Sequence, residues 1–156
     1  MKFEKFVKSL GVHGVIHERK NGERWINGLT AIMKIPDIVT GVMAKAITEM
    51  PEALEDYVNY EQAGIPCYLA KAIMPSGDSG IKDCVRIFKS EDGRFECGIR
   101  NIDFALIEKS DQVEMYIGTN TDTFEEEVKA LLIKRFTTDI KDPDLVGLVM
   151  PYHFEQ

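Results

Sequence analysis

The residues that could carry out chemistry are scattered along the chain. His13 and His17 have the spacing that pairs two metal ligands on a helix. Gly11 and Gly14 instead favour an extended segment, in which side chains four residues apart stand about 13 Å from each other. His153 is accompanied by no nucleophile-elbow motif around a serine or cysteine. We therefore expect neither a metal site nor a catalytic triad among the histidines.

The carboxylates and thiols also lack a reactive pattern. A group of acidic residues falls at helical spacing, which spreads it around a solvated face rather than around one cation. Three cysteines are embedded in apolar sequence, as is typical of small buried side chains. We expect a protein that is not an enzyme and that needs no metal and no cofactor. The residues concerned are Glu49, Glu52, Glu55, Asp56 and Glu61, and Cys67, Cys84 and Cys97.

The composition indicates one acidic domain. The chain has 156 residues and a formal net charge of -7, which allows a sizeable core and argues against a broad nucleic-acid-binding face. No apolar run approaches the roughly 20 residues of a membrane span, and the start lacks the apolar region of a secretory signal. The odd number of cysteines fits reduced thiols. We expect one domain over residues 1–156, inside the cell and without membrane contact.

The most strongly patterned stretch, from Cys84 to Lys109, predicts a β-hairpin. Two runs rich in β-branched and aromatic residues flank Asp92-Gly93, where the glycine supplies the positive φ of a tight turn. After Ile99 the apolar positions change phase, which an unbroken strand cannot do. A bulge or break is therefore expected near Arg100-Asn101.

The N-terminal part predicts a helix followed by a small meander. An amphipathic helix over residues 2–10 ends at Gly11. Asn21-Gly22 joins strands over 12–19 and 23–27, and strand then continues to Pro36. Residues 24–35 form either one strand bent at Gly28 or two short strands, and we favour the bent strand.

Helices are expected next, and the rest of the chain alternates between strand and helix. Helical spacing predicts one helix over 38–50, and Pro51 suits the first turn of another over 51–61. Strands are expected over 67–74, 112–118 and 145–154, with a loop over 75–80. A capping box formed by Thr123 and Glu126 predicts a further helix over 123–136, which has Lys134-Arg135 at its C-terminal end.

Two parts of the chain resemble each other. Asn21-Gly22 and Ala31–Lys34 are echoed roughly seventy residues later by Asp92-Gly93 and Ala105–Ile107. Internal duplication and a chance similarity between two hairpins both stay open. The predicted fold class is α+β: a single domain with a mostly antiparallel sheet, made of two similar hairpin-helix halves with the helices packed on one side.

Short stretches resemble domains of DNA polymerase sliding clamps. Val85–Phe88, Glu91–Gly93 and Asn101–Leu106 are similar to a clamp hairpin, and Leu148–Pro151 is similar to the Val-Met-Pro near the end of bacterial clamps. The resemblance implies a homo-oligomeric ring that binds duplex DNA and a polymerase as an accessory of replication. Basic residues are by themselves typical of solubilising surface charge. The resemblance implies that four of them contact phosphates, namely Lys5, Lys8, Lys129 and Arg135.

The stretches Met1–Ser9 and Asn101–Lys109 also resemble small proteins encoded by tailed phages of gut bacteria. This resemblance implies a location in the cytoplasm of the host bacterium or, alternatively, in the virion. It adds two function classes: a virion structural protein that associates with a major capsid protein or with head assembly, and an inhibitor that binds a host protein. In each class the chain acts without catalysis, by binding itself or another macromolecule.

Overall fold

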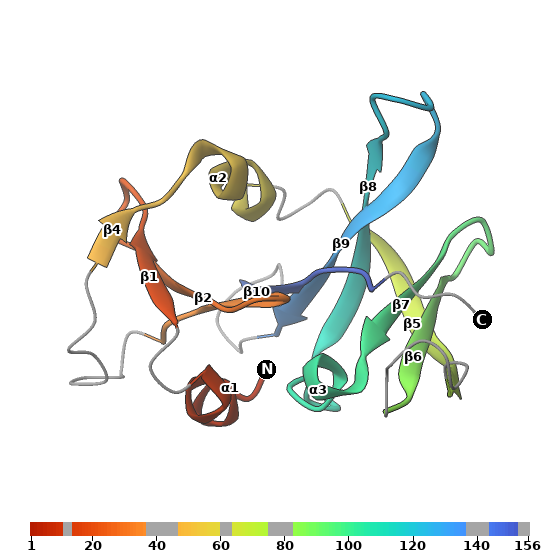
Figure 1. Cartoon of the computed structure of the whole chain (residues 1–156), viewed down its shortest axis with the longest axis horizontal. Helices are drawn as coiled ribbons and strands as arrows, with labels where there is room; N and C mark the ends of the chain where they lie inside the picture. The colour runs from red at the N-terminus through yellow and green to blue at the C-terminus, as the bar shows by residue number, and fades with distance from the viewer. Residues whose placement is uncertain (11–13, 37–46, 60–63, 75–82, 137–143, 153–156) are drawn as a thin grey trace.

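The computed structural model describes residues 1–10, 14–36, 47–59, 64–74, 83–136 and 144–152, which form one mixed, mostly antiparallel sheet with three short helices (Figure 1). The strand order is β4-β1-β2-β3-β10-β9-β8-β5-β6-β7, and among the described pairs only β1 and β4 run parallel. The α+β class is therefore confirmed. The helices are α1 (Phe3–Leu10), α2 (Glu52–Val58) and α3 (Asn101–Phe104); the strands are β1 (Val15–Glu18), β2 (Arg24–Asn27), β3 (Ala31–Lys34), β4 (Ile47–Glu49), β5 (Gly64–Ile73), β6 (Val85–Ser90), β7 (Glu96–Arg100), β8 (Gln112–Thr119), β9 (Glu126–Arg135) and β10 (Asp144–Val149).

The helices α1 and α2 cover opposite faces of the sheet (Figure 1). Phe6 of α1 is buried in one apolar cluster, and Val58 of α2 is buried in a second. Along β9, Leu131 and Ile133 belong to the first cluster and Leu132 to the second. Since successive strand residues point to opposite faces, the sheet lies between two cores. The prediction that the helices pack on one side is wrong, because both faces of the central strands are apolar.

The predicted helix over 123–136 is also wrong, because most of this segment is strand β9. Thr123 does accept a backbone N–H, but the donor is Glu125 at 3.3 Å, in the turn between β8 and β9. Ala130–Ile133 are buried without a break because both faces of β9 are covered. A short continuous apolar run of this kind does not distinguish a helix from a buried strand. Without this helix, the two hairpin-helix halves are not confirmed.

The glycine turns hold in the structure. Gly22 and Gly93 have φ values of +89° and +76° in the β1–β2 and β6–β7 hairpins, as predicted. Gly28 differs from expectation, because β2 and β3 are two antiparallel strands and not one bent strand. The N–H of Gly28 donates to the carbonyl of Ala31 at 2.8 Å and closes the turn between them.

The second predicted helix is confirmed in position as α2, while the first is not. Ile47–Glu49, expected as the end of a helix over 38–50, form β4 beside β1; residues 38–46 lie outside the described residues. The predicted strands over 67–74, 112–118 and 145–154 correspond to β5, β8 and β10. The loop expected over 75–80 also lies outside the described residues.

The predicted break after β7 is confirmed, because α3 begins at Asn101.

The chain beyond β10 runs back to β7. The N–H of Tyr152 donates to the carbonyl of Gly98 at 2.7 Å, and the N–H of Met150 donates to the carbonyl of Thr30 at 2.8 Å. These bonds hold the end of the described chain against β7 and against the turn before β3. None of the helices in the described part is long and apolar enough to span a membrane.

Candidate functional site

The histidine that the structure describes, His17, is engaged in holding the fold. His17 is buried, and its Nδ1 lies 3.0 Å from the Oγ1 of Thr48 on the neighbouring strand β4. Burial lowers the pKa of His17, because it disfavours the imidazolium form. His13 and His153 lie outside the described residues. Within the described part of the chain, no three His, Cys, Asp or Glu side chains are grouped so as to hold a metal ion.

The thiols of Cys67 and Cys97 are poor nucleophiles in this fold. Burial, the largest cause, raises the pKa of each to about 12. Because the thiolate is the reactive form of cysteine, both side chains are almost fully protonated at neutral pH. Cys97 is buried and Cys67 is half-buried against the first core. Their geometry fits packing better than redox chemistry.

The four residues predicted to contact DNA do not share one surface. Lys5 and Lys8 are exposed on α1. Lys129 is the extra residue of a β-bulge in β9, and it lines a hollow beside Tyr57 of α2, on the opposite face. Arg135, at the far end of β9, donates to the carbonyl of Met1 at 3.0 Å. Lys5, Lys8 and Arg135 therefore lie on the side of α1, and Lys129 lies on the side of α2. DNA binding stays a prediction.

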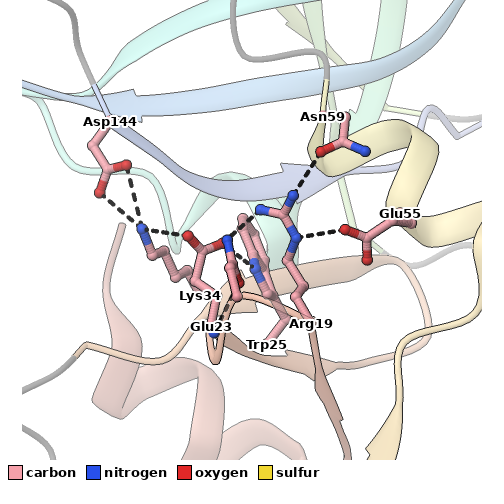
Figure 2. Close-up of polar contacts among 8 residues, drawn as sticks. Arg19, Glu23, Trp25, Lys34, Glu55, Asn59 and Asp144 are labelled. Carbon is pink, nitrogen blue, oxygen red and sulfur yellow. Dashed lines mark hydrogen bonds and ion pairs between the residues drawn. The ribbon is translucent and has the colours of Figure 1, made fainter.

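A charged network ties α2 to the sheet (Figure 2). The guanidinium of Arg19 donates to Glu55 at 2.7 Å, to Asn59 at 2.6 Å and to Glu23 at 2.9 Å. Glu23 also accepts from the indole N–H of Trp25 at 2.9 Å. These contacts join the β1–β2 hairpin to α2 above the buried Trp25 ring. Glu55, expected on a solvated face, is therefore a partner in the network.

The same network extends across β3 to β10. The ammonium of Lys34 lies 3.4 Å from Glu23 and 3.3 Å from Asp144. Burial acts to raise the pKa of Glu23, but hydrogen bonds from Trp25 and Arg19 and the charges of Lys34 and Arg19 lower it overall. Each carboxylate of the network thus faces at least one cation at ion-pair distance. The role of the network is to position α2.

Asp103 of α3 is a buried carboxyl whose second oxygen is unsatisfied. Its exposed fraction is 4%, and Oδ2 has no hydrogen-bond partner among the described residues. Burial raises the pKa of Asp103, and a hydrogen bond to Thr30 and the charge of Arg100 offset this only in part. The folded state therefore binds a proton at Asp103 more readily than the unfolded chain does.

Replacing Asp103 with asparagine is expected to stabilise the protein at neutral pH by about 1 kcal/mol, because it removes a buried charge. A raised folded-state pKa gives stability that is full below the unfolded pKa and is lost as the pH rises through the folded pKa. The gain from Asp103→Asn should therefore disappear near pH 3. Urea unfolding of the unaltered chain and of Asp103→Asn at neutral pH and near pH 3 measures this difference in the free energy of unfolding. An equal destabilisation at both would contradict this role for burial.

The most distinctive exposed element is the hairpin of β8 and β9, which projects from the body of the molecule (Figure 1). Its turn is closely hydrogen-bonded around Asn120. The backbone N–H of Asn120 donates to the backbone carbonyl of Glu125 at 2.8 Å, and the backbone carbonyl of Asn120 accepts from the N–H of Phe124 at 2.9 Å. Its side-chain oxygen accepts from the N–H groups of Asp122 and Thr123 at 2.8 and 3.2 Å. Asn120 thus takes part in most of the hydrogen bonds that shape the turn.

Phe124 is presented to solvent by this turn. Its side chain is 84% exposed, and its φ is +58°, in the left-handed region that a bulky residue rarely adopts. The neighbouring Asp122, Glu125 and Glu126 are all exposed, so that an aromatic ring stands in an acidic setting. Sequence reasoning missed this feature because it placed Phe124 inside the helix predicted over 123–136, where it counted as one of the apolar residues that pack on the sheet. The turn residues Asn120 to Thr123 were the signal that could have identified it.

Comparison with known proteins provides no family assignment: no family model, no curated protein and no solved structure matches this chain.

Proposed function

We propose that this chain is a non-enzymatic assembly protein that binds another copy or another macromolecule through the tip of the β8–β9 hairpin. The observation that supports the proposal is the exposed ring of Phe124, held at positive φ by a hydrogen-bonded turn. Aromatic anchors supply much of the free energy at protein interfaces. An anchor on a pre-ordered turn loses little conformational entropy on binding, which favours association.

The strained backbone of Phe124 also supports a binding role for the hairpin tip. A left-handed phenylalanine costs about 1–2 kcal/mol relative to an extended or helical one. Asn120, Thr123 and Glu125 hold the turn in this conformation through their hydrogen bonds. Strained, solvent-exposed residues that the surrounding structure maintains occur frequently at ligand-contacting sites. The combination of strain with exposure distinguishes Phe124 from the exposed aromatic Tyr68, which lies on strand β5 and has no positive φ.

A clamp-like accessory of phage DNA replication is the second candidate function. The observation that favours it is a set of exposed lysines at α1: Lys2 just before the helix, and Lys5 and Lys8 within it. Such a row can follow phosphates without reading sequence. Assembly through the hairpin is compatible with a ring of this kind and equally with a structural protein of the virion. The assembly role is therefore the broader proposal, and DNA binding is a refinement of it.

Size measurements in cell extract test the proposal without knowledge of the partner. The chain is expected to elute above monomer size in an extract of the cells that make it. Phe124→Ala should shift it to monomer size, because the aromatic anchor is lost. Tyr68→Ala, a matched change of another exposed aromatic residue, should leave the elution unchanged. If the unaltered chain elutes as a monomer in extract, the assembly role is incorrect.

A further inference from the structure

A pocket at the opposite end of β9 has the size and lining to receive an aromatic ring. It holds about 180 Å³ and is lined by side chains that include Phe3 of α1, Met33 of β3 and Val146 of β10. An apolar cavity of about 150 Å³ is sufficient to bind benzene. The pocket is also lined by two cations, Lys34 and Arg135, and by one carboxylate, Asp144. It therefore combines an apolar interior with charged groups among which the cations are in excess.

The hairpin tip has the complementary character. Its ring is apolar and exposed, and its charged neighbours Asp122, Glu125 and Glu126 are acidic. Around the pocket, Lys34 and Arg135 are already paired with Asp144 and Glu108, so their attraction for further carboxylates is modest. Lys5 and Lys8 are exposed on α1, the helix whose Phe3 lines the pocket, and they exceed the one exposed carboxylate of this helix, Glu4, so that α1 adds a small positive charge at this end. Charge complementarity orients the contact, and the ring supplies most of its affinity.

The two features lie too far apart to meet within one molecule. The tip precedes Glu126 at the start of β9, and the pocket contains Arg135 at its end. Ten strand residues span roughly 30 Å. A tip can therefore occupy only the pocket of another copy. Such a contact joins different surfaces of the two molecules, and it repeats into a ring or a filament.

We propose that the partner of the hairpin tip is a second copy of this chain, whose pocket between α1, β3 and β10 receives the ring of Phe124. The inference rests on the proposed assembly function and names its partner. The interface is small, so the assembly is expected to depend on protein concentration. Burial of one phenyl ring is worth about 10- to 100-fold in affinity, and Phe124→Ala should weaken self-association of the purified chain by this factor.

Mixing two defective variants tests the head-to-tail geometry. Phe124→Ala lacks the ring but keeps the pocket, whereas Val146→Phe fills the pocket and keeps the tip. Each purified variant alone should be monomeric in sedimentation at a concentration at which the unaltered chain assembles. A one-to-one mixture should form a dimer and stop there, because one intact tip meets one intact pocket. Ile35→Phe, at another residue lining the pocket, should behave as Val146→Phe does.

The outcomes separate this inference from the proposed function. No dimer in the mixture, or unaltered assembly of both pocket-filling variants when thermal unfolding shows that they are folded, overturns the second-copy partner. A purified chain that stays monomeric, while the assembly in extract still depends on Phe124, overturns the second copy as partner and leaves the assembly function standing. Assembly lost in Tyr68→Ala and retained in Phe124→Ala would place the interface on β5 and overturn both.

Discussion

Replacing Lys134 with methionine is expected to lower the free energy of unfolding by about 3–5 kcal/mol. Lys134 on β9 donates from Nζ to Oε1 of Glu114 on β8 at 2.8 Å, and the two side chains are only 4% and 8% exposed. Gln112 donates to the other oxygen of Glu114. Loss of the cation leaves a carboxylate that is buried without its opposite charge, which is far more costly than loss of a surface pair.

A double variant separates the cost of the unpaired charge from the value of the pair. Lys134→Met combined with Glu114→Leu should recover most of the lost stability, because no buried charge remains. Urea unfolding of the two single variants and the double variant gives the coupling free energy. A loss below about 1 kcal/mol for Lys134→Met, in the range of exposed pairs, would show that water reaches this pair and that its burial has no energetic consequence.

Replacing Phe124 with glycine is expected to change stability and assembly in opposite directions. Glycine adopts positive φ without the cost that phenylalanine meets, and little apolar contact is lost because the ring is exposed. The free energy of unfolding should rise by about 0.5–1 kcal/mol after the greater entropy of glycine in the unfolded chain is counted. Self-association should weaken by about 10- to 100-fold, since the ring that enters the neighbouring pocket is gone.

Alanine and asparagine at the same position provide the controls. Phe124→Ala keeps the strain, because alanine meets the same clash at positive φ, so its stability should equal that of the unaltered chain. Phe124→Asn should fall between alanine and glycine, since asparagine tolerates the left-handed region. All three should lose assembly alike. Thermal unfolding and sedimentation measure the two properties, and a destabilised glycine variant would show that the ring packs against its own molecule.

Local signals were sufficient to predict the tight hairpins. Asn21-Gly22 and Asp92-Gly93 are dipeptides typical of tight turns, because glycine adopts positive φ without strain. The structure has a turn with a positive-φ glycine at each. The break after Ile99 followed from a change of apolar phase, and α3 begins there. These predictions succeeded because the cause and the structure lie within a few residues of each other.

Features set by distant parts of the chain could not be predicted in this way. The run Ala130–Ile133 is apolar because α1 and α2 cover both faces of β9, which a local pattern does not reveal. Lys134 fitted the C-terminal end of a helix dipole, whereas its partner Glu114 lies 20 residues away on another strand. The misassigned helix also concealed Phe124, because a ring on a buried helical stripe gives no indication of an exposed turn.

Photo-crosslinking from position 124 tests the assembly most directly. A diazirine-bearing phenylalanine at this position keeps the ring and, on illumination, labels the atoms next to it. We predict crosslinks between two copies that map to residues 33–36, Asp144 or Val146, which line the pocket. Reaction of the probe with water alone, so that no crosslink forms, or crosslinks to strands remote from this pocket, would contradict insertion of Phe124 into a neighbouring copy.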